Sequence, residues 1–543
     1  MGSRLLRPKR LATLALLTVS VAVGVWWLGY IPYDPMAIYR PVPSSASVVG
    51  RHLALPDRWG DLLANPLALA MMRTAGADPE EAAWLIEDEA SRQWFEKLAG
   101  REGVLAYRPG RFGLPPAWMA VSHLGGESQK LRWQLSLFDV PGFERMTQFP
   151  GRLVWRVETP DLPPSEHLVI AFGEGVILAC LSENPLAMSE VLGAYDGTVR
   201  RLLEEELSFK RFAEGDDRRQ PDRLWVRDPT EFAPDAAPGL VVNIPVLRGE
   251  AMSLSVESEG MDIVPETAGI RADLGRLGDV LGGAPCAAAL VPREALEHWA
   301  LQGGIPSDVR HALRMILEVA GPHLAVVFMD GKMGGRLAWG AMSSLGLSGL
   351  RVPTLLLATP VSGDAAAAAA IQRVLDRSNA RHRAAFVLRP LTQGGVTMHV
   401  LESAGGDEWV DALARSDRPA YAVRDGWLLA SSNLDALQKL VRGGETVPGA
   451  TWTESLHGEE AVSAWLDLAR SGKVARDAMA TWSMAQMFLD GGSSPEMRER
   501  LNEAKTWIDA FVPFGTARAR VERRDGRAAL SLDLGLFPDG GLD

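Results

Sequence analysis

Cysteine is nearly missing from this sequence, because the 543 residues include only Cys180 and Cys286. Two cysteines cannot form a disulfide framework, and neither lies near the N-terminus, where a lipoprotein needs one to carry its lipid. Both stand in apolar stretches, VILACLS and APCAAALV, that are typical of strands. We therefore expect two small buried side chains, while a bond between them stays open at this point.

The usual short motifs of metal sites and enzymes are also missing. The nine histidines form no His-x-His or HExxH pattern, and there is no Cys-x-x-Cys pair. Glu297, His298 and His311 form the closest grouping, which is more typical of unrelated residues. GxSxG and the phosphate-binding GxxxxGKS or GxxxxGKT are absent, and Gly173 and Gly175 lie in a hairpin pattern rather than in a dinucleotide-binding loop. The sequence therefore predicts no catalytic residue, no metal ligand and no cofactor.

An excess of positive charge is missing as well. The chain has 56 basic and 68 acidic residues, a net charge of −12. Four of the basic residues lie within the first ten, so the remainder has 52 basic against 68 acidic residues, a balance of −16. Such a surface argues against nucleic acid as a partner. Apolar residues make up 47% of the chain, which is enough for packed cores and excludes general disorder.

The first thirty residues predict a membrane anchor. A basic tail, residues 1–10, precedes an uncharged apolar run from Leu11 to Tyr30. At about 1.5 Å per residue, a helix of this length spans a hydrocarbon core of about 30 Å. The positive charges ahead of the run place the N-terminus in the cytoplasm, so we expect a single-pass protein of the bacterial inner membrane whose bulk is periplasmic. A signal peptide cleaved after Ala22 is the alternative.

Two distant stretches of the chain share one pattern. Residues 166–192 and 418–441 each read as an apolar strand, a glycine-containing turn, a second apolar strand that ends in serine, and then asparagine and a short helix. Asp-Gly between apolar runs predicts a type I′ hairpin turn at residues 425–426. Asn184 and Asn433 are suited to cap the helices that follow them.

This recurrence predicts the architecture. The order strand-helix-strand-hairpin-helix is expected at residues 131–195 and again at 354–442, with Gly175 and Gly426 in equivalent turns. We expect an α+β fold, in which an N-terminal transmembrane helix is followed by two related lobes of mostly antiparallel sheet with helices on one face, and by a C-terminal half-unit on the second lobe. The expected divisions are a basic tail (1–10), an anchor (11–30), a Pro-rich extended spacer (31–45), a first lobe (46–215), connecting strands (224–275), a second lobe (283–445) and the half-unit (459–536).

The two patterned segments carry a resemblance. AYAVRDGWLLASSNLDALQKL and LVIAFGEGVILACLSENPLAMSEVL, behind a single N-terminal anchor, resemble segments of uncharacterised bacterial single-span membrane-anchored extracytoplasmic proteins with repeated α+β units. The resemblance rests on the order of elements and on these two segments. It implies a fold and a location, and it implies no activity.

Tryptophan is abundant, with 17 residues against 6 tyrosines. Six tryptophans stand in periodic apolar segments and are expected in the core, namely Trp84, Trp94, Trp155, Trp339, Trp427 and Trp465. Others stand beside turns or polar residues and are the interface candidates, namely Trp59, Trp118, Trp225 and Trp452. We therefore expect a non-catalytic protein that binds a protein partner or an envelope component. The alternative is an envelope hydrolase whose catalytic residues are dispersed along the chain.

Overall fold

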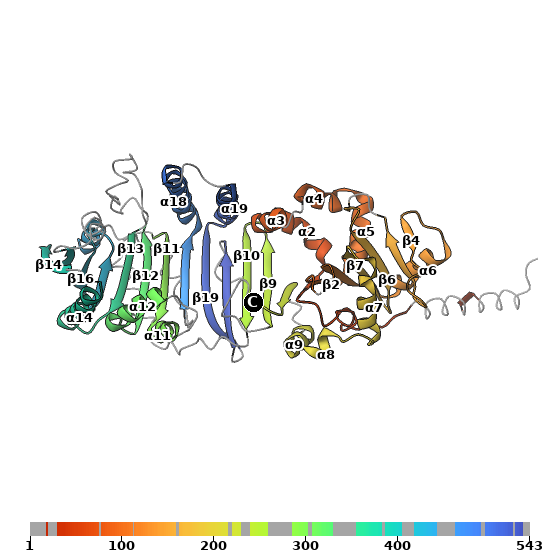
Figure 1. Cartoon of the computed structure of the whole chain (residues 1–543), viewed down its shortest axis with the longest axis horizontal. Helices are drawn as coiled ribbons and strands as arrows, with labels where there is room; N and C mark the ends of the chain where they lie inside the picture. Colours follow the sequence, from red (N-terminus) through yellow and green to blue (C-terminus); the bar gives the residue numbers. More distant parts are fainter. Residues whose placement is uncertain are drawn as a thin grey trace, which may run out of the picture. The chain divides into compact units, whose positions relative to one another are not determined.

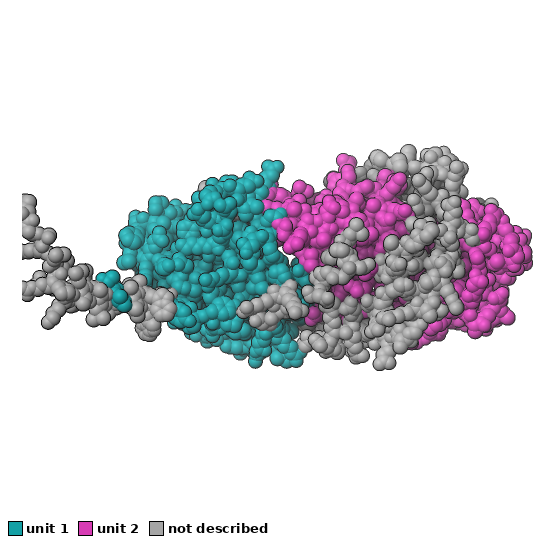
Figure 2. Space-filling view, turned by 180° about the vertical axis from the view of Figure 1, so that it is seen from behind, with its two compact units in different colours: residues 1–60, 80–231, 238–245 teal, residues 61–79, 232–237, 246–543 magenta. Residues whose placement is uncertain are grey.

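The computed structural model divides the chain into two compact units, coloured separately in Figure 2. Unit 1 comprises residues 1–60, 80–231 and 238–245, and unit 2 comprises residues 61–79, 232–237 and 246–543. The fold is α+β with antiparallel strands, as expected. The structure describes residues 18–19, 30–74, 78–111, 113–158, 162–215, 220–229, 239–258, 285–301, 307–329, 354–382, 386–403, 418–442, 462–489, 495–524 and 527–535.

Unit 1 is built on an antiparallel sheet with the strand order β4-β5-β6-β7-β3-β2-β1-β8-β9 (Figure 1). The strands are β1 (Val48–Leu53), β2 (Glu102–Arg108), β3 (Ala117–His123), β4 (Phe143–Arg145), β5 (Val154–Val157), β6 (His167–Phe172), β7 (Val176–Ser182), β8 (Asp222–Val226) and β9 (Leu240–Arg248). Every second residue of β2, β3 and β7 is buried, because side chains alternate between the faces of a strand. One face of the sheet therefore belongs to the core of the unit.

In unit 2 the antiparallel strands have the order β14-β15-β16-β17-β13-β12-β11-β18-β19-β20-β10. The strands are β10 (Ala251–Ser258), β11 (Ala287–Pro292), β12 (His323–Met329), β13 (Thr354–Pro360), β14 (Phe386–Gln393), β15 (Val396–Ser403), β16 (Ala420–Arg424), β17 (Trp427–Ser431), β18 (Val462–Asp467), β19 (Thr516–Arg524) and β20 (Arg527–Leu534). The strands β18 to β20, which we expected in a C-terminal half-unit on the second lobe, are hydrogen-bonded into this order of strands.

The nine strands of unit 1 correspond in order to nine of the eleven strands of unit 2. Raising each label of β1 to β9 by ten gives the order from β14 to β19, and β20 and β10 are additional strands of unit 2. The helix α6 (Gly126–Leu137) follows β3 as α14 (Asp364–His382) follows β13. The correspondence therefore begins at β3 rather than at residue 131. The expected strand at residues 131–138 is wrong, because residues 131–137 lie in α6.

Helices lie on both faces of the unit 2 sheet, so the prediction of helices on one face is wrong. Leu437 of α16 packs in one cluster with Ala422, whereas Ala367 of α14 packs in another with Tyr421. Neighbouring residues of a strand point to opposite faces, which places α14 and α16 on opposite faces. The remaining helices of this unit are α3 (Pro66–Thr74), α11 (Arg293–Leu301), α12 (Ser307–Val319), α16 (Leu434–Val441), α18 (Leu468–Leu489) and α19 (Pro495–Phe511).

The helices of unit 1 follow the same arrangement. Met188 and Val191 of α7 belong to the main core cluster together with Met119 of β3. On the other face of β3, the Ser122 hydroxyl donates a hydrogen bond to the carbonyl of Leu98 in α5. The helices are α2 (Leu55–Ala64), α4 (Pro79–Glu87), α5 (Glu89–Ala99), α6, α7 (Met188–Asp196), α8 (Leu202–Glu205) and α9 (Leu207–Glu214).

The local predictions at the two hairpins are confirmed. Asp425 and Gly426 both have positive φ, 52° and 81°, as a type I′ turn requires. Gly175 has φ of 76° and occupies the corresponding β6–β7 turn. The Asn433 side chain accepts a hydrogen bond from the Ala436 backbone N–H at 3.1 Å, which caps α16. Asn184 likewise accepts from the backbone N–H of the short 3₁₀ turn Pro185–Ala187 ahead of α7.

The segment expected to be an extended spacer, residues 31–45, packs instead into the core of unit 1. Ile38 and Tyr39 are 0% and 1% exposed, and both belong to the main core cluster with Val42. Backbone hydrogen bonds fold the segment into consecutive turns, including one from the Tyr39 N–H to the Met36 carbonyl. The prolines directed the prediction towards an extended chain, but the apolar residues between them supply enough buried area to fold it.

The expected anchor lies almost wholly outside the described residues, which include only residues 18, 19 and 30 of it. In the described part of the chain, no helix is both long enough and apolar enough to cross a bilayer. The anchor therefore stays a prediction from the sequence.

Candidate functional site

The floor of the candidate site is the α14 face of the unit 2 sheet. Leu357 of β13 pairs with Ala430 of β17, and Ala430 pairs with Tyr421 of β16. Tyr421 in turn pairs with His399 of β15. Residues that lie directly opposite each other across antiparallel strands point to the same face, so these side chains form one row. The neighbouring residue Ala358 points the other way, into the core beneath α16.

Two helices form the roof over this row. The helix α12 contributes Ile316 and Val319, which pack towards the sheet. The helix α14 begins with an unbroken run of alanines, residues 365–370, and Ala367 packs against the floor residues Tyr421 and Leu428. The alanines allow close packing at this end, and larger aliphatic side chains follow them along α14.

A cavity of about 550 Å³ lies between this floor and this roof. Its volume falls within the range of about 300–1,000 Å³ that small-molecule sites occupy. Most of its wall is aliphatic, and the lining residues are Met315, Ile316, Val319, Ala320, Leu324, Leu355, Leu357, Thr359, Ile371, Val374, Leu375, Ser378, Phe386, Leu388, His399, Leu401, Pro419, Ala420, Tyr421, Leu428, Ala430, Ser431 and Ser432. A site of this composition selects ligands by their apolar surface.

An ion pair joins the two roof helices. Arg377 of α14 donates hydrogen bonds to both carboxylate oxygens of Glu318 in α12, and the Nη2 to Oε2 distance is 2.5 Å. The Arg377 side chain is 61% exposed, so the pair adds little to stability. Its two parallel hydrogen bonds connect the two helices that cover the cavity.

Three of the hydroxyl groups in the wall are engaged with the backbone. The Thr359 hydroxyl donates to the His323 carbonyl at 2.8 Å, and the Ser431 hydroxyl donates to the Asn433 carbonyl at 2.9 Å. The Ser432 hydroxyl accepts from the Leu355 N–H at 3.1 Å. These groups stabilise strand ends and turns, which leaves them poorly placed to act as nucleophiles.

Besides Ser378 of α14, Tyr421 and His399 provide the other polar groups of the wall. Their rings stack with centroids 4.8 Å apart and an interplanar angle of 14°. Burial raises the pKa of Tyr421, so its hydroxyl stays protonated and remains a hydrogen-bond donor. Within the described part of the chain, neither ring donates or accepts a hydrogen bond. The cavity is therefore a mostly apolar space, with two polar rings side by side on β15 and β16 and the Ser378 hydroxyl on α14.

The corresponding position in unit 1 has a different character. The strands β7 and β17 can be aligned at the serines that end them, Ser182 and Ser431. In this alignment Trp118 of β3, which pairs with Leu181, is equivalent to Leu357 of β13, which pairs with Ala430. Trp118 is 46% exposed and packs against Tyr107, with ring centroids 4.7 Å apart. In addition, α6 spans 12 residues where α14 spans 19. The bulky Trp118 side chain thus occupies the place where Leu357 borders the cavity of unit 2.

The four interface candidates have different surroundings. Trp118 is exposed, as an interface residue should be, whereas Trp225 is 0% exposed and packs in the unit 1 core against Phe209. The expectation for Trp225 is therefore wrong, because its indole N–H donates to the Ser208 hydroxyl inside the fold. Trp59 is half-buried, and its indole N–H donates to the Ala82 carbonyl at 2.8 Å. Trp452 lies outside the described residues.

The tryptophans expected in the core are also divided. Trp155, Trp427 and Trp465 are buried, as expected. Trp84 and Trp94 are 57% and 50% exposed, so that part of the prediction is wrong. Their apolar spacing along the helices indicated a buried stripe, but the structure turns these two rings outward. Trp339 lies outside the described residues.

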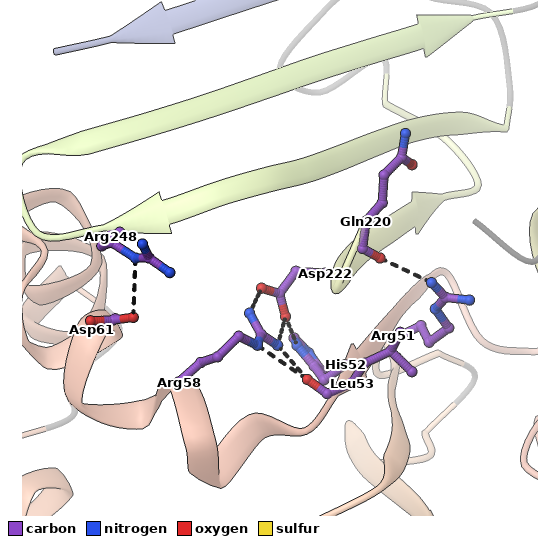
Figure 3. A network of polar contacts seen from close by, with 8 residues as sticks. All are labelled: Arg51, His52, Leu53, Arg58, Asp61, Gln220, Asp222 and Arg248. Carbon is purple, nitrogen blue, oxygen red and sulfur yellow. Dashed lines mark hydrogen bonds and ion pairs between the residues drawn. The ribbon is translucent and has the colours of Figure 1, made fainter. Parts of the chain in front are cut away.

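A buried charged cluster in unit 1 was a second candidate site (Figure 3). Asp222 of β8 accepts hydrogen bonds from His52 of β1, at 2.8 Å, and from Arg58 of α2. Burial would raise the pKa of Asp222, but these hydrogen bonds and the Arg58 charge hold it below its usual value. Arg58 is further fixed by the Leu53 carbonyl. Both carboxylate oxygens are engaged, so the cluster acts as a structural clamp rather than as an acid or base.

The two cysteines are buried, as the sequence predicts. Cys180 and Cys286 form no disulfide, and burial raises the pKa of Cys180 to about 12. A thiol with such a pKa is a poor nucleophile at neutral pH. Among the described residues, no group of three or more histidine, cysteine or acidic side chains is placed to hold a metal ion.

The cavity was not predicted from the sequence. Its wall draws on six strands and two helices between residues 315 and 432, and no short motif connects them. One local signal pointed to it, since His399 interrupts the otherwise apolar strand VTMHVLES. A lone histidine in such a strand is more often a core residue than a ligand-binding one, so the signal carried little weight.

Comparison with known proteins gives no further information about the site. No protein-family model, no curated protein and no solved structure matches this chain.

Proposed function

We propose that this protein is a non-catalytic, membrane-anchored extracytoplasmic protein of the bacterial inner membrane that binds an envelope component through the cavity of unit 2. The observation that supports this proposal best is the aliphatic cavity of about 550 Å³ under α12 and α14. Apolar burial contributes about 0.8 kcal/mol per methylene group, so a cavity of this kind favours a ligand with a substantial hydrocarbon part. Such ligands are abundant in a bacterial envelope.

The sequence supports the location. The uncharged residues 11–30 follow a basic tail, and the 52 basic against 68 acidic residues beyond the tail suit a body that stays clear of anionic lipid.

We further propose that units 1 and 2 arose by duplication of one α+β lobe. The one-to-one correspondence of nine strands supports this, because the order of strands in each sheet is not the order along the chain.

The alternative function is an envelope hydrolase that acts on an acyl ester held in the cavity. His399 and Tyr421 would be its acid or base. Against this alternative, the hydroxyls of Thr359 and Ser431 already donate to backbone carbonyls, which removes them as nucleophiles.

The test is recovery of a bound ligand. The full chain would be extracted with its surrounding membrane by an amphiphilic copolymer, and organic extracts would be compared by mass spectrometry. Leu357→Trp would fill the cavity with a residue that the equivalent position of unit 1 already holds as Trp118. We expect a hydrocarbon-bearing compound with the wild-type chain, and much less of it with Leu357→Trp.

The matched control is Val387→Trp. Val387 is 38% exposed and next to Leu388 on β14, and its side chain points away from the cavity. We expect this variant to retain the compound. Equal recovery from all three proteins would contradict the proposal. Turnover of an acyl ester that is lost in Tyr421→Phe would favour the hydrolase.

A further inference from the structure

The shape of the cavity narrows the class of ligand, on the basis of the proposed function. Its floor runs from Leu324 on β12 to Leu388 on β14 and crosses β13, β17, β16 and β15 in between. Five interstrand steps of about 4.8 Å give a length of about 24 Å. A cavity of about 550 Å³ whose lining extends over that length suits one extended hydrocarbon chain better than a compact ring system.

The two polar rings lie towards one end of this cavity. Tyr421 and His399 lie on the fourth and fifth of the six strands, next to the edge strand β14. The opposite end, beneath α12, is lined by Met315, Ile316 and Leu324. The cavity therefore has an aliphatic end and an end with hydrogen-bonding side chains.

We infer that unit 2 binds a single long acyl chain, with the methyl end beneath α12 and the carbonyl-bearing head against Tyr421 and His399. The Tyr421 hydroxyl donates a hydrogen bond to a head-group oxygen, and the His399 ring offers a second donor beside it. A free fatty acid and the acyl ester of a single-chain lipid share this chemistry. Both present an oxygen acceptor at the head of one hydrocarbon chain.

The orientation can be read by photolabelling. The full chain in lipid nanodiscs would be exposed to two palmitic acid probes, one with a diazirine near the carboxylate and one with a diazirine near the methyl end. We expect the first to label the peptides of β15 and β16, and the second to label α12 and β12. Identical labelling by both probes, or the reverse order, would overturn the inferred orientation.

A third probe separates this inference from the proposed function. A diazirine-bearing hexadecane has the same chain without the head. If it labels unit 2 as strongly as the palmitic acid probes, the head recognition is refuted while apolar binding stands. If no probe labels unit 2, both the inference and the proposed function fail. A single-chain phospholipid with the methyl-end diazirine distinguishes an ester head from a free carboxylate.

Conservative variants test the polar contact. Tyr421→Phe keeps the ring and the stacking but removes the hydroxyl, so we expect about fivefold weaker binding of the palmitic acid probes. His399→Phe should have a similar effect. Neither variant should change the labelling by hexadecane, because that probe has no head. Equal loss for all probes would indicate a damaged cavity and would overturn the assigned role of these two residues.

Discussion

Arg58 of α2 and Asp222 of β8 form a bidentate ion pair inside unit 1, although they are 164 positions apart along the chain. The Asp222 side chain is only 8% exposed, and His52 on β1 contacts the same carboxylate. The pair therefore ties a helix to two neighbouring strands.

The first prediction is that Arg58→Leu destabilises the protein. Removing one partner leaves the Asp222 carboxylate buried without its main counter-charge, which costs about 3–5 kcal/mol. The measurement is urea unfolding of wild type and variant. Arg92→Leu is the control, because Arg92 pairs with Glu89 on the surface of α5, and we expect almost no change in its unfolding midpoint. Similar midpoints for Arg58→Leu and Arg92→Leu would disprove the clamp.

The second prediction concerns pH. The pKa of Asp222 lies below its usual value of 3.8 in the folded protein, so its charged form favours folding above that pH. This contribution is lost as the pH falls below about 4. The stability difference between wild type and Asp222→Asn should be largest at neutral pH and should shrink on acidification, as measured by denaturant unfolding from pH 7 to pH 3. A constant difference would rule out this coupling.

The third prediction concerns the ion pair over the cavity. Arg377→Gln breaks the contact with Glu318 but removes only an exposed pair, so the melting temperature should hardly change. The variant lacks this connection between the two roof helices, so we expect a fluorescent fatty acid to dissociate several-fold faster in stopped-flow measurements. Arg373→Gln, an exposed change on the same helix, should leave the rate unaltered. The double variant with Glu318→Arg and Arg377→Glu should restore slow dissociation. Unchanged rates in Arg377→Gln would show that the pair does not control access.

The fourth prediction isolates backbone geometry. Gly426 has φ of 81°, and a Cβ added there would meet no atom within 4 Å. Gly426→Ala should therefore cost about 1–2 kcal/mol through the left-handed backbone alone. Gly363→Ala also places its Cβ in open space, but the backbone there lacks the positive φ, so its unfolding free energy should change little. Equal effects of the two substitutions would contradict the type I′ turn.

The fifth prediction separates core from surface among the interface candidates. Trp225→Ala removes a fully buried side chain and should cost about 3–5 kcal/mol of unfolding free energy. Trp118→Ala removes a ring that is 46% exposed and should cost much less. A loss of protein partners in Trp225→Ala would then reflect unfolding, whereas a loss in Trp118→Ala at full stability would indicate a contact surface.

The features that the sequence predicted correctly are local ones. The Asp425-Gly426 turn and the Asn433 cap depend on residues within a few positions of one another, and their backbone requirements can be recognised directly. The wrong predictions concern segments whose structure depends on which side chains are buried in the folded protein. The stretch LRWQLSLF alternates like a strand, yet in α6 Leu131 is buried while Leu137 is 76% exposed. The cavity could not be predicted from the sequence either, because its wall depends on which strands become neighbours in the sheet.

The packed segment that follows the predicted anchor has a mechanical consequence. Ile31 lies against Gly175, where an added Cβ would come within 3.1 Å of it, and Tyr33 donates a hydrogen bond to Glu102 at 2.7 Å. Only a few residues then separate the predicted span from the first fixed contacts of the body, and a residue reaches at most about 3.5 Å. If the predicted span forms, the link between it and unit 1 is short. A force on that span would then reach the β6–β7 turn through the contact between Ile31 and Gly175.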